Sequence, residues 1–154
     1  SLSEAVMLFG SSLALVQYSS LSNNDNDKTS KQFSWKMSKI NGLFTAFALL
    51  VLCLLPQNVY TFIFGEGFSE ISTAIRILSI GILPLSIASN FTQYFYAKGN
   101  FKISTVASLI GLAVTIIAGL ILIPKYQLQG AAFTATLSYF TTFAIEFYFF
   151  ALKK

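Results

Sequence analysis

The stretch "IPKYQLQGAAFTATLSYF", which runs from Ile123 to Phe140, decides how this chain folds. An almost purely apolar run ends at Ile123, and a proline, a lysine and a short polar bend follow it. Gly130 then opens a second apolar run that begins with glycine and two alanines. A connection of about five residues is typical of two neighbouring antiparallel helices, and small residues let helix backbones approach closely. The stretch therefore predicts a tight helical hairpin.

The composition indicates the solvent in which this hairpin folds. The 154 residues are 55% hydrophobic and only 10% charged, whereas a soluble domain has about 25% charged residues. A chain so poor in charge cannot cover a water-facing surface, so we expect a membrane protein. The chain contains no histidine and one cysteine, Cys53, so it lacks the commonest metal ligand and general base. We predict no catalytic residues, no cofactor, no metal site and no nucleic-acid partner.

Five apolar segments are each close to the length of about 20 residues that a helix needs to cross a bilayer. They lie at about residues 4–21, 39–63, 71–97, 103–123 and 128–151. Segments of this length that cross lipid are helices, because their backbone groups must bond within the segment. The sequence predicts an all-α fold, a polytopic transmembrane bundle of about five helices. We divide it into a partial or first helix (1–21), a cytoplasmic connector (22–38) and a four-helix part (39–154).

The basic residues predict the orientation of the bundle. If the helices alternate in direction, eight of the ten basic residues fall on one side, namely Lys28, Lys31, Lys36, Lys39, Lys98, Lys102, Lys153 and Lys154. The positive-inside rule makes that side cytoplasmic, which places the N-terminus outside and the C-terminus inside. The chain has no initiator methionine and no signal-peptide features. Its first apolar segment carries five serines and a glutamine, so it would insert poorly into a membrane alone. We therefore expect it to be a C-terminal fragment of a longer membrane protein.

The segment 71–97 carries polar residues along one helical face. A spacing of alternately four and three residues joins Ser72, Arg76, Ser79, Leu83, Ser86, Asn90, Gln93 and Ala97. Polar groups at membrane depth face protein or water, so this stripe either bonds neighbouring helices or lines a substrate cavity. The candidates for a cavity lining are Arg76, Ser79, Ser86, Asn90 and Gln93. Arg76 lies near the outer end, where snorkelling to the surface is an alternative, and Pro84 should kink the helix.

Small residues in the last two segments predict close helix packing. We expect Gly111, Gly119, Gly130 and Ala131 to lie where the two helices meet. Glu146 is a carboxylate within an apolar run of the last segment. It either reaches the cytoplasmic surface or faces the interior as an ion- or proton-linked group.

Three stretches of the sequence, which include the connections between apolar segments, resemble the sequences of one known family. "IFGEGFSEISTAIRIL", "YAKGNFKIS" and "LIPKYQLQGAAFTATLSY" are similar to the C-terminal part of polysaccharide flippases. These belong to the multidrug/oligosaccharidyl-lipid/polysaccharide exporter superfamily. One departure is "KYQLQG", because the family often has a glycine directly after the tyrosine. The resemblance implies a parent of about 12–14 helices in two lobes, of which this chain is the C-terminal lobe.

The resemblance also implies a location and partners. The parent would lie in the bacterial cytoplasmic membrane and move a lipid-linked oligosaccharide, carried on polyprenyl pyrophosphate, from the inner to the outer leaflet. The partners would be this substrate, membrane lipid and the missing N-terminal lobe. In such a flippase, Arg76, Asn90 and Gln93 would line the cavity, and Arg76 could pair with the pyrophosphate.

Four function classes differ in the residues that they require. The first is a flippase that works by alternating access in O-antigen, capsule or exopolysaccharide biosynthesis. A drug/cation antiporter of the same superfamily would need a buried carboxylate, for which Glu146 is the candidate. A membrane enzyme would need a histidine or paired carboxylates as base, and the sequence has neither within its apolar segments. A non-catalytic structural membrane subunit remains a further alternative.

Overall fold

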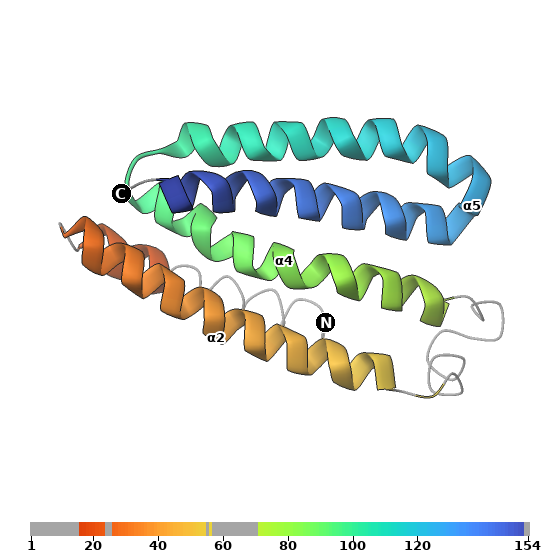
Figure 1. The fold of residues 1–154 in the computed structure, drawn as a ribbon, viewed down its shortest axis with the longest axis horizontal. Helices are drawn as coiled ribbons and strands as arrows, with labels where there is room; N and C mark the ends of the chain where they lie inside the picture. Colours follow the sequence, from red (N-terminus) through yellow and green to blue (C-terminus); the bar gives the residue numbers. More distant parts are fainter. Residues whose placement is uncertain (1–15, 24–25, 55, 57–70, 153–154) are drawn as a thin grey trace.

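The computed structural model describes residues 16–23, 26–54, 56 and 71–152. Three long helices make up most of this part, namely α2 (Asp27–Leu54), α4 (Ile71–Ala97) and α5 (Phe101–Leu152) (Figure 1). Residues 16–22 are also helical, and the described residues contain no strand, which confirms the predicted all-α fold. Each long helix has the length and composition to cross a membrane. Most of the first apolar segment and the "FGEGF" turn lie outside the described residues.

The predicted hairpin is present within α5, which folds back on itself at Gln127 (Figure 1). Gln127 has φ 46° and ψ −118°, so it is not helical. The two halves of α5, residues 101–126 and 128–152, run side by side in opposite directions (Figure 1). These halves correspond to the fourth and fifth predicted segments, and α4 has the bounds predicted for the third. α4 continues as one helix through Pro84.

The α4–α5 turn is closed by a glycine-dependent cap. Gly99 has φ 69°, its N–H donates to the carbonyl of Tyr96 (3.0 Å), and the N–H of Asn100 donates to that of Phe95 (2.8 Å). This is the Schellman pattern, in which a left-handed residue after the helix lets two orphan carbonyls find donors. The cap ends α4 and starts α5 within three residues, so the two helices lie next to each other.

The connector predicted at residues 22–38 is mostly helical. α2 begins at Asp27, twelve residues before the predicted second segment, and the Asn26 side chain accepts a hydrogen bond from the N–H of Lys28 (3.1 Å). An asparagine at this position satisfies a free N–H of the first turn, and an aspartate beside it favours the positive end of the helix dipole. The polar composition of this stretch therefore led to a prediction of a connector where the structure has the capped N-terminus of α2.

α4 is the central helix, because it packs against both α2 and α5 (Figure 1). α2 presents small buried residues on one face, namely Ser30, Ser34, Ser38 and Gly42. Small side chains at this spacing let two helices in lipid approach closely. Large apolar side chains lie instead on the outside, for example Leu43 (75% exposed) and Leu120 (74%). Small or polar residues inside and large apolar residues outside are what a lipid solvent favours.

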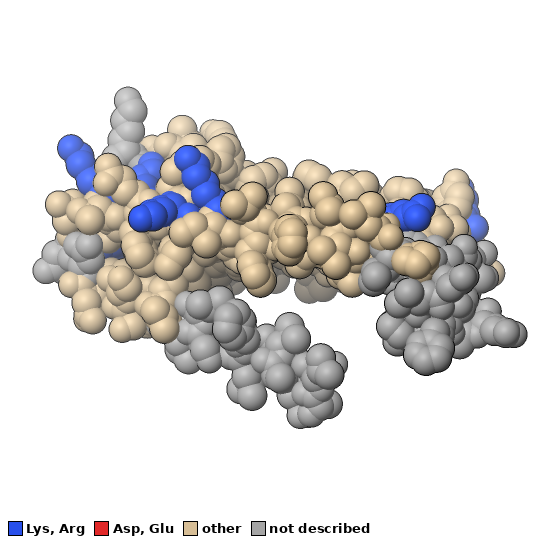
Figure 2. Space-filling model, turned by 90° about the horizontal axis from the view of Figure 1, so that it is seen from below, with Lys and Arg blue, Asp and Glu red and all other residues tan. Residues whose placement is uncertain are grey.

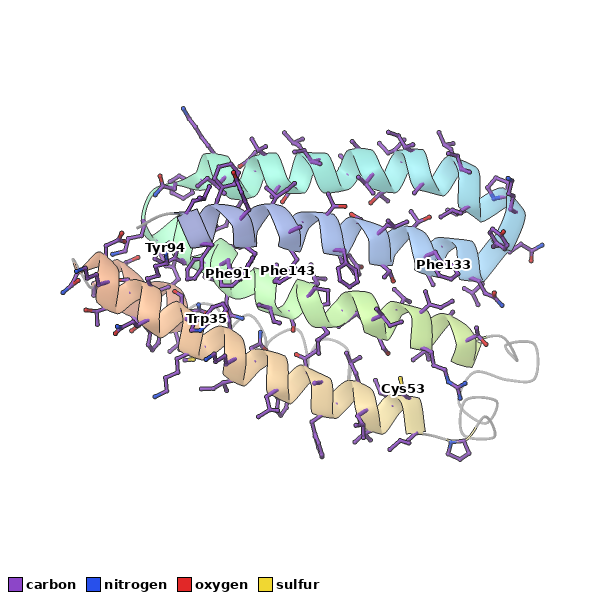
Figure 3. The ribbon with its side chains drawn as sticks, viewed as in Figure 1. Trp35, Cys53, Phe91, Tyr94, Phe133 and Phe143 are labelled. Carbon is purple, nitrogen blue, oxygen red and sulfur yellow. The ribbon has the colours of Figure 1, made fainter. Side chains whose placement is uncertain are left out.

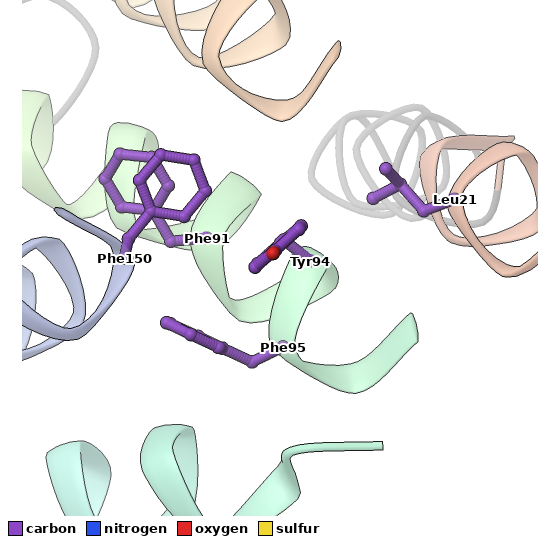
Figure 4. Close-up of a cluster of buried hydrophobic side chains, with 5 residues drawn as sticks. All are labelled: Leu21, Phe91, Tyr94, Phe95 and Phe150. Atoms are coloured by element: carbon purple, nitrogen blue, oxygen red, sulfur yellow. The ribbon is translucent and has the colours of Figure 1, made fainter. Parts of the chain in front are cut away.

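Aromatic side chains pack together where α2, α4 and the end of α5 meet. The buried cluster consists of Leu21, Phe91, Tyr94, Phe95 and Phe150 (Figure 4). The rings of Phe91 and Phe150 stack with centroids 4.4 Å apart, and Trp35 of α2 stacks on Phe91 at 6.2 Å. Lysine and arginine side chains gather towards the two ends of the molecule and leave the middle of the visible face bare (Figure 2). This charge distribution is expected of helices that cross a bilayer.

Candidate functional site

A largely apolar groove lies between α2, α4 and the second half of α5. Its volume is about 680 Å³, and its polar lining residues are Cys53, Arg76 and Ser79. Phe140 and Phe143 of α5 contribute aromatic walls. Figure 3 shows Cys53 near the end of α2 that lies away from Trp35. The groove therefore has a basic and polar end, where Arg76 lies near Cys53, and an apolar end at Phe143.

Arg76 is the charged residue of this groove. Its side chain is exposed, and among the described residues no carboxylate forms an ion pair with it. The Ser79 hydroxyl lies one turn along the same helix and donates to the carbonyl of Ile75 (2.7 Å). The Cys53 thiol donates to that hydroxyl from α2 (3.5 Å). A guanidinium carries five N–H donors, so Arg76 has the chemistry to bind an anionic group.

The structure divides the predicted polar stripe of α4. Arg76, Ser79 and Leu83 line the groove, whereas Ser86, Asn90 and Gln93 do not. The hydroxyl of Ser86 donates to the carbonyl of Leu83 (2.8 Å). The buried amide of Asn90 donates to the carbonyl of Ser86 (2.9 Å). The side chain of Ser72 lies outside the described residues.

Backbone carbonyls in the second part of the stripe accept hydrogen bonds from neighbouring helices. Gln17 donates from its side chain to the carbonyl of Asn90 (3.2 Å), and Asn41 of α2 donates to the carbonyl of Ser86 (2.9 Å). Sequence reasoning missed Gln17 and Asn41, although each is an amide within an apolar segment. An amide in lipid needs a protein partner, and this signal could have identified both residues.

The α5 hairpin is held by glycines at two close contacts. A Cβ at Gly130 would overlap the carbonyl group of Leu122, so only glycine fits where the second half begins. A Cβ at Gly111 would lie 2.5 Å from the Thr142 hydroxyl, and the carbonyl of Gly111 accepts a hydrogen bond from Ser138 (2.8 Å). The structure thus places both residues where the two halves meet.

The other small residues behave differently. A Cβ at Gly119 would meet only ordinary contacts, the nearest at 3.4 Å to Ile123 of its own half. Ala131 is exposed, whereas Ala132 is buried. Sequence reasoning did not identify Gly81 of α4, where a Cβ would lie 2.7 Å from the Cα of Thr136. The α4–α5 contact therefore also depends on a glycine.

Glu146 faces the interior of the bundle. Its side chain is only 1% exposed, so of its two predicted placements the structure has the interior one. The Thr92 hydroxyl of α4 donates to Glu146 Oε1 (2.8 Å). Among the described residues, neither Glu146 Oε2 nor the hydroxyl of buried Ser104 has a hydrogen-bond partner in good geometry, although the Ser104 side chain lies close to the Glu146 carboxyl group. Within the described part of the chain, no three Cys, Asp or Glu side chains lie close enough together to hold a metal ion.

Comparison with known proteins gives the family. Residues 4–154 match the family described as "Lipid II flippase MurJ". The chain belongs to this family. Since flippases are membrane proteins and the described helices can cross a bilayer, it is a multi-pass membrane protein.

Two curated relatives are much longer than this chain. The chain is 32% identical over 110 residues to "Capsular polysaccharide biosynthesis protein CapF" of Staphylococcus aureus, which covers 71% of the chain and 28% of the relative. It is 29% identical over 100 residues to "Uncharacterized membrane protein MJ1068" of Methanocaldococcus jannaschii, covering 65% of the chain and 20% of the relative. No solved structure matches. The matched segments therefore span only about a quarter of the length of these relatives.

Proposed function

We propose that this chain is part of the C-terminal lobe of a flippase that moves a lipid-linked oligosaccharide across the bacterial cytoplasmic membrane for surface polysaccharide synthesis. Membership of the MurJ family supports flipping of a lipid-linked substrate, and the relative named for capsular polysaccharide biosynthesis supports this class of sugar product. The observation that carries the proposal is the apolar groove with Arg76 at one end, where no carboxylate of the described residues forms an ion pair with it.

The residues that line the groove are complementary to an amphiphilic anion. A polyprenyl pyrophosphate joins a long apolar tail to two phosphates, and a guanidinium can bind phosphate oxygens through two parallel hydrogen bonds. Arg76 remains charged at any physiological pH, while Leu83, Phe140 and Phe143 offer apolar surface further along the groove. In alternating access, one lobe rocks against the other around such a site. We place the groove on the side that faces the N-terminal lobe and the lysine-rich end in the cytoplasm.

A drug/cation antiporter of the same superfamily is the second candidate. The buried carboxyl of Glu146 favours it, because a buried acidic residue in a membrane bundle is a typical ion-binding group. The relative from Staphylococcus aureus favours the flippase instead. Surface polysaccharide and drug resistance are separate phenotypes, so one set of variants can distinguish the two functions.

The test is complementation of a strain that lacks the full-length parent, scored for surface polysaccharide, with immunoblots for protein level. We expect Arg76→Ala to abolish polysaccharide at a normal protein level and Arg76→Lys to rescue it only in part, because an ammonium lacks the two-pronged donor set. Lys125→Ala is the matched control, since Lys125 is also basic and exposed but lies on the hairpin turn. Wild-type polysaccharide from the Arg76→Ala strain would contradict the proposal.

A further inference from the structure

A second groove lies where the N-terminal part of α2 meets the last turns of α5. Its volume is about 350 Å³. Six residues line it, namely Lys31, Gln32 and Trp35 of α2 and Phe147, Phe150 and Ala151 of α5. None of them lines the groove at Arg76, and none is acidic. The second groove is therefore a separate, largely apolar site with a basic side chain in its lining.

Two half-exposed aromatic rings form walls of this groove. Trp35 and Phe147 are each 40% exposed, and their ring centroids lie 6.2 Å apart. Trp35 also stacks at 6.3 Å on Phe150, which is buried. A half-exposed tryptophan near the end of a membrane helix lies at the headgroup level, where one side of its ring contacts acyl chains and the other contacts polar groups. The groove therefore lies at the depth where the headgroup of a phospholipid joins its acyl chains.

Two ammonium groups lie on either side of Trp35 along α2. The Nζ of Lys39 lies 5.5 Å from the centre of the Trp35 ring, and the Nζ of Lys31 lies 5.1 Å from the centre of the Phe150 ring. Residues four apart share one face of a helix, so both lysines extend from the side of α2 that carries Trp35. Attraction between an ammonium and an aromatic face favours these positions. The aromatic walls thus hold positive charge beside the apolar groove.

The surrounding charge is also positive. The N-terminal half of α2, the α4–α5 turn and the first turn of α5 carry six described lysines, namely Lys28, Lys31, Lys36, Lys39, Lys98 and Lys102. The described residues contain two carboxylates, and both are engaged: Asp27 accepts a hydrogen bond from Tyr94 (3.0 Å), and buried Glu146 accepts one from Thr92 (2.8 Å). Figure 2 shows basic side chains gathered at the ends of the visible face. Such a surface attracts anions.

We propose that this groove binds one anionic phospholipid, such as phosphatidylglycerol, from the leaflet at the lysine-rich end of the bundle. Lys31 and Lys39 contact the phosphate as point charges, and Trp35 and Phe147 contact an acyl chain. A zwitterionic phospholipid carries a cation of its own, so its headgroup gains little from the lysines. This site does not depend on the proposed function, because any membrane protein with this groove would bind the same lipid.

The lipid-linked substrate is a weaker candidate for this groove. Two linked phosphates suit the forked donors of a guanidinium, which the other groove supplies at Arg76, whereas a single phosphate suits the compact ammonium of a lysine. Phospholipid also surrounds the protein in excess, so that even a weak site is filled by mass action. A bound phospholipid contacts α2 and the last turns of α5 together, and we expect it to stabilise their packing.

Tryptophan quenching by brominated lipids tests the site directly. The purified full-length parent is placed in phosphatidylcholine vesicles that contain increasing amounts of brominated phosphatidylglycerol or, separately, brominated phosphatidylcholine. Bromine quenches tryptophan on contact, and the difference between wild type and Trp35→Phe isolates the signal of Trp35. We expect brominated phosphatidylglycerol to quench Trp35 at a mole fraction at least about fivefold lower than brominated phosphatidylcholine, the effect of one lysine near an anionic lipid.

Two lysine variants provide the matched comparison. Lys31→Gln should raise the mole fraction of brominated phosphatidylglycerol that is needed about fivefold, whereas Lys36→Gln on the same helix should change it much less, since Lys36 does not line the groove. Both variants keep Trp35, so they remain decisive if Trp35→Phe fails to fold. Equal quenching by the two lipids, or equal effects of the two variants, would overturn the site. Relief of quenching by equimolar undecaprenyl diphosphate would assign the groove to the substrate instead.

Discussion

Replacement of Gln127 by glycine should stabilise the protein. Gln127 has φ 46° and ψ −118°, a region in which the Cβ of an L-residue clashes with its own backbone. Such a conformation costs about 1–3 kcal/mol for a non-glycine residue. Glycine removes this cost but adds about 0.5–1 kcal/mol of unfolded-state entropy. We expect Gln127→Gly to raise the free energy of unfolding by about 1 kcal/mol, near the middle of the range of about 0–2.5 kcal/mol that these two contributions allow.

The matched control lies two residues away. Gln129 is helical, so Gln129→Gly should lower stability by about 1 kcal/mol. Both variants are compared with wild type by thermal unfolding of the full-length protein in detergent, followed by far-UV circular dichroism. The side chain of Gln127 is exposed, so its loss removes little packing. The reasoning is refuted if Gln127→Gly is as destabilising as Gln129→Gly, since the backbone at Gln127 would then not be strained.

Two further predictions concern packing and orientation. Gly130→Ala should lower the free energy of unfolding by about 1–3 kcal/mol, because its Cβ would overlap Leu122, whereas Gly119→Ala should be tolerated; equal thermal stability of the two variants would exclude the close contact. Cysteines introduced at residues 66–69 should react with a membrane-impermeant thiol reagent in intact cells, and those at the exposed residues 26–29 only after permeabilisation, as the positive-inside rule requires; the reverse pattern would invert the topology.

Most of the described fold could be predicted because lipid imposes simple rules. A segment that crosses the bilayer must satisfy its own backbone, so its length and apolar character identified α4 and both halves of α5. The start of α2 was missed, because the rules for apolar segments do not apply to "NDKTSKQFSWKMSK". There the helix depends on the Asn26 cap and on the buried serines that pack against α4.

The candidate site was predicted less completely. Periodicity placed Arg76 and Asn90 on one face, and both lie on that face, but only Arg76 lines the groove. Which polar residues bond a neighbour depends on where the neighbouring helices cross α4. Gln17 and Asn41 lie far from Asn90 and Ser86 in sequence, and no local pattern records such pairings.

The sequence by itself determined that the chain lies in a membrane, that it forms a helical hairpin and that Gly130 begins the second half of this hairpin. These features depend on composition, segment length and local turn chemistry. Only the tertiary structure decided that Glu146 lies inside the bundle, because its burial depends on how α4 packs against both halves of α5. A carboxylate five residues from the end of an apolar segment can reach water or turn inward with the same sequence around it. The packing of three helices, which no single segment encodes, selects between these two states.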